Sequence, residues 1–302
     1  MLDYRLLTFM NLYQTMNYTK TAKNLKITQP AVTQHIKYLE AAYQVKLFHY
    51  AKKKLTTTKE GEYLYRCASA LQANSSKVFS DILCLNEDKT SLKLGASPTI
   101  AQYWMPAVLK RLEDTDRMFE VELTVDATDQ LVNQLRRGEI DMAFVEGNFD
   151  SSTVHAQALR KEEIVLAVPV DHELSSKGTV SFNDILDERL LHGDEHDVCG
   201  AVVNQALQTN NLSVGSFRSH MVINDNEVIK QMIKEGIGIG FVYQSAIREE
   251  LAEHALAAVK IKGCKLMREF FMIYLNETIF KDQFQEFYHS CQMILKDLNS
   301  NI

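Results

Sequence analysis

Residues 19–61 read TKTAKNLKITQPAVTQHIKYLEAAYQVKLFHYAKKKLTTTKEG, and this stretch decides the fold of the N-terminal region. Apolar residues recur at helical spacing in two short segments that only a few residues separate. Thr19 is a candidate N-cap for a helix over 20–25, and Thr28 for a helix to about Ala42, with Pro30 in its first turn. The pattern predicts a helix-turn-helix, a motif that places its second helix in the DNA major groove.

The outward face of that second helix is polar. Glutamine and threonine can pair with base edges, whereas lysine suits phosphates. A lysine run follows between two short predicted strands, a wing. The expected base contacts are Gln29, Pro30, Thr33 and Gln34, and the expected phosphate contacts are Lys37, Lys52, Lys53 and Lys54. The alternative is an ordinary helical hairpin with a solvated lysine loop.

The stretch 19–61 resembles the winged helix-turn-helix of LysR-type transcriptional regulators. The best-matched pieces are Ala22…Leu25, ITQPAVTQHI from Ile27, Leu39-Glu40, Leu47-Phe48 and Thr58…Gly61. Three residues depart from the family pattern: Thr21 stands where the family usually has the first of two alanines, Gln44 where it usually has glycine, and Tyr50 where it usually has arginine. The resemblance implies a sequence-specific regulator that binds an imperfect palindrome in double-stranded DNA.

Charge is distributed unevenly along the chain. Residues 1–66 carry 11 basic and 4 acidic residues, whereas the remainder carries 22 basic and 35 acidic ones. A basic N-terminal region, the head, on an acidic body indicates that only the head meets a polyanion. The alternative is chance variation of surface charge.

A long helix is predicted from about Lys59 to Leu85. Its apolar positions repeat every seven residues, which is typical of a coiled-coil seam rather than of a buried helix. The two seam positions are occupied by Leu64, Leu71, Val78 and Leu85 and by Ala68, Ser75 and Ile82. Residues 86–90 are polar and are predicted to be a hinge. The resemblance implies a dimerisation helix, and hence a homodimer or homotetramer.

The acidic body alternates predicted strands and helices, which indicates parallel βαβ units. Residues 236–240 (GIGIG) follow a helix and precede an apolar strand, so they predict a helix C-cap rather than a dinucleotide site.

Three pieces of the body match the LysR-type effector domain in order and spacing: Leu94-Gly95…Ser97-Pro98-Thr99, residues 138–143 (GEIDMA), and residues 227–232 (EVIKQM) followed by 236–240. The body therefore resembles that domain, a two-lobed fold of the periplasmic-binding-protein type. The chain is therefore predicted to be multidomain: a winged helix-turn-helix (1–58), a linker helix and hinge (59–90), and an α/β effector domain (91–302) with lobe I at 91–160 and 266–302 and lobe II at 161–265.

Small-molecule ligands bind at the C-terminal ends of parallel strands, close to helix N-termini. Polar residues that follow three predicted strands of lobe I are therefore candidates for effector contact. They are Ser97, Thr99, Gln102, Thr128, Glu146 and Gly147. The alternative is that the hydroxyl groups among them only cap helices.

Many family members carry a Gly-Ser-Gly-Thr-Arg-like loop at the start of a lobe II helix, whereas residues 192–200 here read HGDEHDVCG. His196 and Val198 fall in this loop and are candidates for effector contact. The acidic loop disfavours an anion, so the effector is expected to be neutral, cationic or held away from this loop, and a merely solvated loop is also open. A metal held by His192, His196 and Cys199 is a third interpretation, although Gly193 disfavours the helical turn that it needs. No metal or cofactor is predicted.

Other classes of protein are less favoured by the sequence. It contains no nucleophile elbow, P-loop or HExxH motif that would indicate an enzyme. The five widely spaced cysteines and the lack of a signal-peptide pattern favour the cytoplasm over a secreted solute-binding protein. A DNA-binding protein whose cleft has lost its ligand is the remaining alternative. The predicted partners are DNA, an effector, a second copy of the chain and RNA polymerase.

Overall fold

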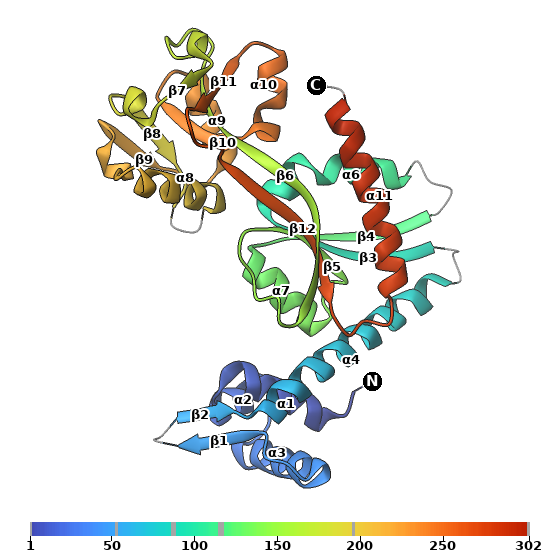
Figure 1. Cartoon of the computed structure of the whole chain (residues 1–302). Coiled ribbons are helices and arrows are strands. Elements are labelled where there is room, and N and C mark those ends of the chain that lie inside the picture. The colour runs from blue at the N-terminus through green and yellow to red at the C-terminus, as the bar shows by residue number, and fades with distance from the viewer. Residues whose placement is uncertain (1, 52–53, 86–88, 114–117, 195–196, 301–302) are drawn as a thin grey trace.

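The computed structural model describes residues 2–51, 54–85, 89–113, 118–194 and 197–300. Three parts follow one another along the chain: a small helical head, one long helix and a larger α/β body (Figure 1). Lys52, Lys53 and His196, which the sequence predicts to bind DNA or effector, lie outside the described residues. None of the helices in the described part combines the length and apolar character that crossing a membrane requires.

The head is a three-helix unit followed by a two-stranded wing. Its elements are α1 (Tyr4–Thr15), α2 (Tyr18–Leu25), α3 (Gln29–Tyr43), β1 (Phe48–Ala51) and β2 (Lys54–Thr57). Thr28 caps α3 as predicted, because its Oγ1 accepts the N–H of Ala31 at 3.3 Å. The predicted cap of α2 is wrong: Asn17, whose backbone is extended, accepts the N–H of Lys20 at 2.9 Å, and Thr19 lies inside the helix.

The wing is fixed to the helices by side chains of the matched motif. Glu40 Oε1 accepts the N–H of Leu47 at 3.0 Å, and its Oε2 pairs with Lys46 Nζ at 2.7 Å. A Cβ on Gly61 would lie 2.4 Å from the carbonyl oxygen of Leu47, so only glycine lets the long helix start this close to the wing. The motif Thr58…Gly61 is therefore a packing requirement.

The long helix α4 (Lys59–Cys84) begins at Thr58, whose Oγ1 accepts the N–H of Gly61. The second half of the predicted seam is exposed: Leu71 is 55% and Ile82 57% accessible. The first half is not, because Ala68 is buried in the core of the head and Leu64 packs against it. A straight helix drifts relative to a seven-residue repeat, so the predicted seam packs on the head at its first half and faces solvent at its second.

A neighbouring face of α4 packs on the body of the same chain. The Asn74 side chain donates to the carbonyl oxygen of Glu277 at 3.2 Å and accepts from Thr278 Oγ1 at 3.1 Å. Lys77 is buried and donates to the carbonyl oxygen of Ser91 at 2.7 Å. These bonds attach the linker helix to the body.

One continuous sheet runs through the body, with strand order β4-β3-β5-β12-β6-β10-β8-β9; β11 pairs in addition with β6, and β7 pairs with β11. Two long antiparallel strands, β6 and β12, cross between the lobes (Figure 1). The strands are β3 (Lys89–Ala96), β4 (Met118–Val125), β5 (Met142–Glu146), β6 (Val154–Pro169), β7 (Thr179–Val180), β8 (Arg189–His192), β9 (Ser219–Val222), β10 (Ile239–Tyr243), β11 (Leu256–Ile261) and β12 (Met267–Leu275). Strand β3 includes Lys89 and Thr90, which the sequence places in the hinge.

Helices cover both faces of this sheet, as the α/β prediction requires. They are α5 (Pro98–Tyr103), α6 (Met105–Glu113), α7 (Thr128–Arg137), α8 (Val198–Thr209), α9 (Asn226–Lys234), α10 (Arg248–Ala252) and α11 (Lys281–Ser300). The GIGIG segment leaves α9 through Gly236, at φ +70°, and leads into β10, which confirms the helix-to-strand prediction.

Candidate DNA interface and effector cleft

Helix α3 presents a polar surface at the end of the head. Its apolar residues Val32, Ile36 and Leu39 are buried, which turns the opposite face to solvent. Gln29, Pro30, Gln34, Lys37 and Lys54 are exposed there and in the wing, and Thr33 is half-buried. The Thr33 hydroxyl donates to the carbonyl oxygen of Gln29 at 3.2 Å, so its oxygen can only accept in a further contact, and its methyl group is also available.

Two further side chains extend this surface and were missed by sequence reasoning. Tyr38 is exposed on α3, and the Arg5 guanidinium carbon lies 3.8 Å from the centroid of its ring. Arg5 is also paired with Asp3, at 3.2 Å. A single arginine 33 residues before a tyrosine gives no periodic signal, so only the folded chain brings them together.

In the body, the predicted effector residues meet around Glu146, the last residue of β5. Glu146 is only 3% exposed, and its Oε1 accepts from Ser97 Oγ at 3.3 Å. Its Oε2 accepts from the hydroxyl group of Tyr243, the last residue of β10 in lobe II. The Thr128 hydroxyl donates to the carbonyl oxygen of Glu146 at 3.0 Å, and Ala127 rather than Thr128 occupies the N-cap position of α7.

The remaining predicted residues of this site fall around that group or outside it. Thr99 is buried and hydrogen bonds to Glu146. A Cβ on Gly147 would lie 3.2 Å from Val198 Cγ1 across the cleft and 2.8 Å from Arg268 Nη2. Gln102 is exposed, and none of the described hydrogen bonds joins it to this group.

Electrostatics in the cleft favour uncharged forms. Burial raises the pKa of the Glu146 carboxyl group, and the nearby Asp197 carboxylate raises it further, against hydrogen bonds from Tyr243, Thr99 and Ser97. Burial likewise raises the pKa of the Tyr243 hydroxyl group. The Cys199 thiol is buried and its pKa lies well above its usual value, which disfavours the reactive thiolate.

Asp197 takes the helix terminus that a bound anion would use. Its Oδ1 accepts the N–H of Cys199 at 3.0 Å, and it also accepts backbone N–H groups of Gly193 and Gly200. The metal interpretation finds no support among the described residues, where no three His, Cys, Asp or Glu side chains are placed to hold an ion. His192 Nε2 lies 3.1 Å from His220 Nδ1, whereas Cys199 Sγ points to the carbonyl oxygen of Phe241.

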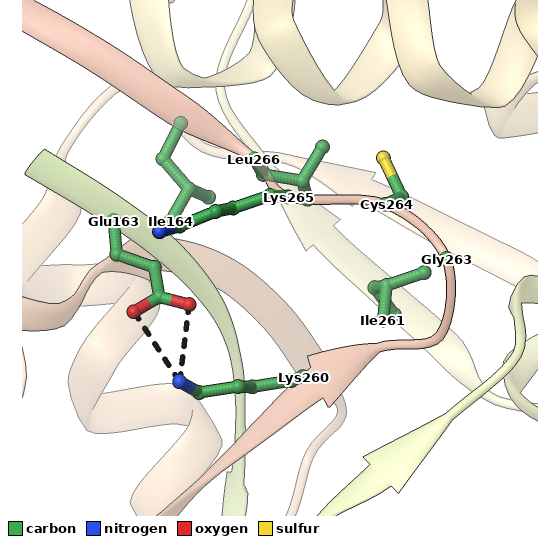
Figure 2. A pocket seen from close by; sticks show the side chains of 8 residues that line it. All are labelled: Glu163, Ile164, Lys260, Ile261, Gly263, Cys264, Lys265 and Leu266. Atoms are coloured by element: carbon green, nitrogen blue, oxygen red, sulfur yellow. Dashed lines mark hydrogen bonds and ion pairs between the residues drawn. The ribbon is translucent and has the colours of Figure 1, made fainter.

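A separate hollow lies beside the crossover strands. A groove of about 490 Å³ lies between β6, β11 and the loop that enters β12 (Figure 2). Across it, Lys260 Nζ lies 3.3 Å from Glu163 Oε1, and the Cys264 side chain points away from that pair. None of the predicted effector residues lines this groove.

Two family profiles match the chain in the order that this architecture requires. "Bacterial regulatory helix-turn-helix protein, lysR family" matches residues 4–62, and "LysR substrate binding domain" matches residues 86–293. The chain belongs to the LysR family of bacterial transcriptional regulators. It is a LysR-type regulator with an N-terminal DNA-binding helix-turn-helix domain and a C-terminal substrate-binding domain.

Individual LysR-type relatives are distant in sequence but similar in extent. The HTH-type transcriptional regulator CysL of Bacillus subtilis is 25% identical over 87% of each chain, and CitR of the same organism is 26% identical over 88% of this chain and 90% of its own. An H2O2-bound OxyR mutant of Corynebacterium glutamicum superposes with a TM-score of 0.63 at 21% identity, over 97% of this chain and 92% of its own. Full-length BenM gives 0.57 at 19% identity, over 100% and 97%. At these identities the structures show a shared fold.

Proposed function

We propose that the chain regulates transcription by reading an imperfect palindrome in double-stranded DNA with two copies of α3. The observation that carries this proposal is the exposed polar face of α3 above its buried apolar stripe. Gln29, Pro30, Thr33 and Gln34 contact bases, and Lys37, Lys52, Lys53 and Lys54 neutralise phosphates. The chain acts as a regulator and not as an enzyme, and it works in the cytoplasm.

The second copy of α3 comes from a second copy of the chain, which associates through α4 in a homodimer or a homotetramer. Leu71, Val78 and Ile82 lie on one exposed face of the helix, at the spacing of a coiled-coil seam. An Ile82→Asp substitution is expected to convert dimers to monomers in sedimentation measurements and to abolish binding to the full palindrome. Matched substitution of Lys59, which is exposed at the start of α4 and off that seam, leaves the dimer intact.

The body supplies regulation. A small-molecule effector binds between lobe I (91–160 and 266–302) and lobe II (161–265) and changes the angle between the lobes. In each copy the linker (59–90) connects the body to the head (1–58), so the change in lobe angle alters the spacing of the two heads of a dimer. Its contacts are Ser97, Thr99, Gln102, Thr128, Glu146, Gly147, His196 and Val198, and RNA polymerase is the downstream partner. Because Asp197 and Glu146 already use donors that an anion needs, the effector is neutral or cationic.

One observation favours a second candidate, a DNA-binding protein that needs no effector. The cavity that borders Tyr243, Lys230 and Cys199 holds only about 10 Å³, roughly the room that one water molecule needs. A thermal-shift screen with neutral and cationic metabolites separates the two candidates. A specific rise in melting temperature supports the effector-gated regulator, and a flat response across the screen supports the constitutive one.

A mobility-shift titration tests the proposed DNA function. The DNA is the region upstream of the gene itself and its divergent neighbour, with random DNA as competitor and at two salt concentrations. We expect a shift that survives competition at both salts. A shift that competitor removes and that falls steeply with salt would contradict specific recognition, since phosphate contacts alone behave in this way.

A further inference from the structure

The two lobes meet through hydrogen bonds of the chain's own side chains. Tyr243 lies at the end of β10 in lobe II and Glu146 at the end of β5 in lobe I, and the phenol donates to the carboxylate across the cleft. Tyr243 is 2% exposed. A hydrogen bond between two groups this well buried is shielded from water and costs free energy to break.

The phenol ring of Tyr243 packs against aromatic side chains at the crossover strands. Its centroid lies 5.3 Å from that of Phe270 on the crossover strand β12, at an interplanar angle of 75°, an edge-to-face contact. Phe270 lies in turn 4.8 Å from Trp104, at the end of α5. The ring therefore contacts the crossover strand, while its hydroxyl group reaches the polar group at the ends of the lobe I strands.

A second contact joins the lobes at the rim of the cleft. The Tyr103 hydroxyl of lobe I donates to Glu227 Oε1 of α9 at 2.7 Å. Lys230, one turn along α9, lies 2.8 Å from the same oxygen, and its Nζ is 5.5 Å from the Tyr103 ring centroid. Both contacts hold the lobes in the arrangement in which about 10 Å³ is left beside Tyr243.

We propose that the Tyr243 phenol is a built-in occupant of the effector cleft, which holds the lobes together through Glu146, and that an effector binds by displacing it. This inference rests on the proposed function, because it takes the space between the lobes as the effector site. It predicts the chemical class of the competitor: a neutral compound with an aromatic ring and a hydroxyl group, which can replace both the edge-to-face contact and the hydrogen bond.

Two variants of Tyr243 separate the hydroxyl group from the ring. Tyr243→Phe keeps the ring and removes the donor, and Tyr243→Ala removes both and leaves a cavity of the size of a phenol. Tyr288→Phe is the matched control, because Tyr288 is also buried and donates to the carbonyl oxygen of Ala158 at 2.6 Å, within lobe I and away from the cleft.

Hydrogen–deuterium exchange of the full-length protein reads out lobe opening. We expect exchange in peptides covering 97–104 and 239–246 to become about tenfold faster or more in Tyr243→Phe, as loss of a hydrogen bond to a carboxylate implies. Tyr288→Phe leaves those peptides unchanged. Equal exchange in Tyr243→Phe and wild type overturns the proposal, whatever the other variant does.

Chemical rescue tests the occupant directly. The probe is 4-methylphenol, the side-chain analogue of tyrosine. We expect it to raise the melting temperature of Tyr243→Ala by several degrees and that of the wild type by much less, since in the wild type the probe must first displace the Tyr243 ring. A folded Tyr243→Ala protein that does not respond contradicts the proposal, and if this variant does not fold, the exchange of Tyr243→Phe decides.

The mobility shift of the wild type on its own upstream DNA is measured in parallel. If the wild type gives no shift but exchange is faster in Tyr243→Phe, the proposed function is contradicted and the interlobe contact of Tyr243 is supported. An intact shift with unchanged exchange removes only the built-in occupant.

Discussion

The head and the cleft use polar side chains in opposite ways. In the head, Gln29, Gln34 and Lys37 are exposed on α3, and we propose that their partner is DNA. In the cleft, Ser97, Glu146 and Tyr243 are buried and are bonded to one another. The polar groups on the exposed face of α3 can bind another molecule without breaking bonds within the protein. In the cleft, a ligand can bind the polar groups only after the hydrogen bonds among them have broken.

The largest expected difference between the two regions comes from replacing one buried and one exposed lysine by methionine. Lys230 is 7% exposed and lies 3.0 Å from Glu250, itself buried, and 2.8 Å from Glu227. Lys230→Met leaves a buried carboxylate without its cation, and we expect the free energy of unfolding to fall by about 3–5 kcal/mol. Lys37→Met, on the exposed face of α3, should change it by less than about 0.5 kcal/mol.

Denaturant unfolding measures both values, and DNA affinity should show the reverse order. Lys37→Met weakens specific and random DNA alike, because it removes a phosphate contact, and Lys230→Met leaves the affinity of the folded protein for random DNA unchanged. Similar losses of stability in the two variants would show that the ion pairs of Lys230 at the cleft stabilise the fold no more than the exposed side chain of Lys37 does.

The protonation of Glu146 gives the next largest effect. Its pKa is raised in the folded protein, so the folded state binds the proton more tightly than the unfolded state. The stabilisation that results is present below the ordinary carboxyl pKa of about 4 and is lost as pH rises through the raised pKa. The titratable groups that face Glu146 are Tyr243, Asp197, Cys199 and Arg268.

Glu146→Gln removes this proton and keeps a side chain of similar shape. Relative to the variant, wild-type stability should fall with rising pH by at most about 1.4 kcal/mol per pH unit between the two pKa values. Urea titrations of both proteins from pH 4 upward measure the difference. A difference that stays constant with pH would mean that Glu146 has an ordinary pKa and that the cleft is open to water.

A smaller effect is expected in the head. Gln44 ends α3 in the left-handed conformation, at φ +56°, where its N–H bonds to the carbonyl oxygen of Glu40. Glycine adopts this conformation without steric cost, so Gln44→Gly should stabilise the protein by about 0.5–1 kcal/mol. Thermal unfolding measures this, and an unchanged or lowered melting temperature would show that Gln44 makes a contact which compensates for its backbone.

The sequence predicts what is local. Helical spacing in 28–42 gave α3, its cap and its outward face, because the buried stripe and the cap lie within one segment. The cap of α2 was misplaced. The spacing of apolar residues in 100–112 predicts one amphipathic helix, whereas the chain breaks at Trp104, before Pro106 in the first turn of α6. The apolar run 164–170 predicts a strand, but β6 begins ten residues earlier at Val154, in a stretch that mixes polar and apolar residues.

In the cleft, the sequence predicts the lobe I residues of the interlobe hydrogen bond but not their lobe II partner. Strand ends pointed to Ser97, Thr99 and Glu146, and these do lie together. Tyr243 is 97 residues from Glu146 and reads as an ordinary strand residue, so its partner is known only once the sheet has formed. Whether an effector touches these residues stays a prediction.

The central claim is that the exposed face of α3 reads a DNA sequence, and a comparison of Gln34→Ala with wild type in the mobility-shift assay tests it most directly. Gln34 is exposed, so the variant should fold and keep its affinity for random DNA. Its affinity for the specific site should fall by about 1–3 kcal/mol, roughly five- to 150-fold, so that site preference is lost. Equal loss on specific and random DNA, or no loss on either, would contradict the claim.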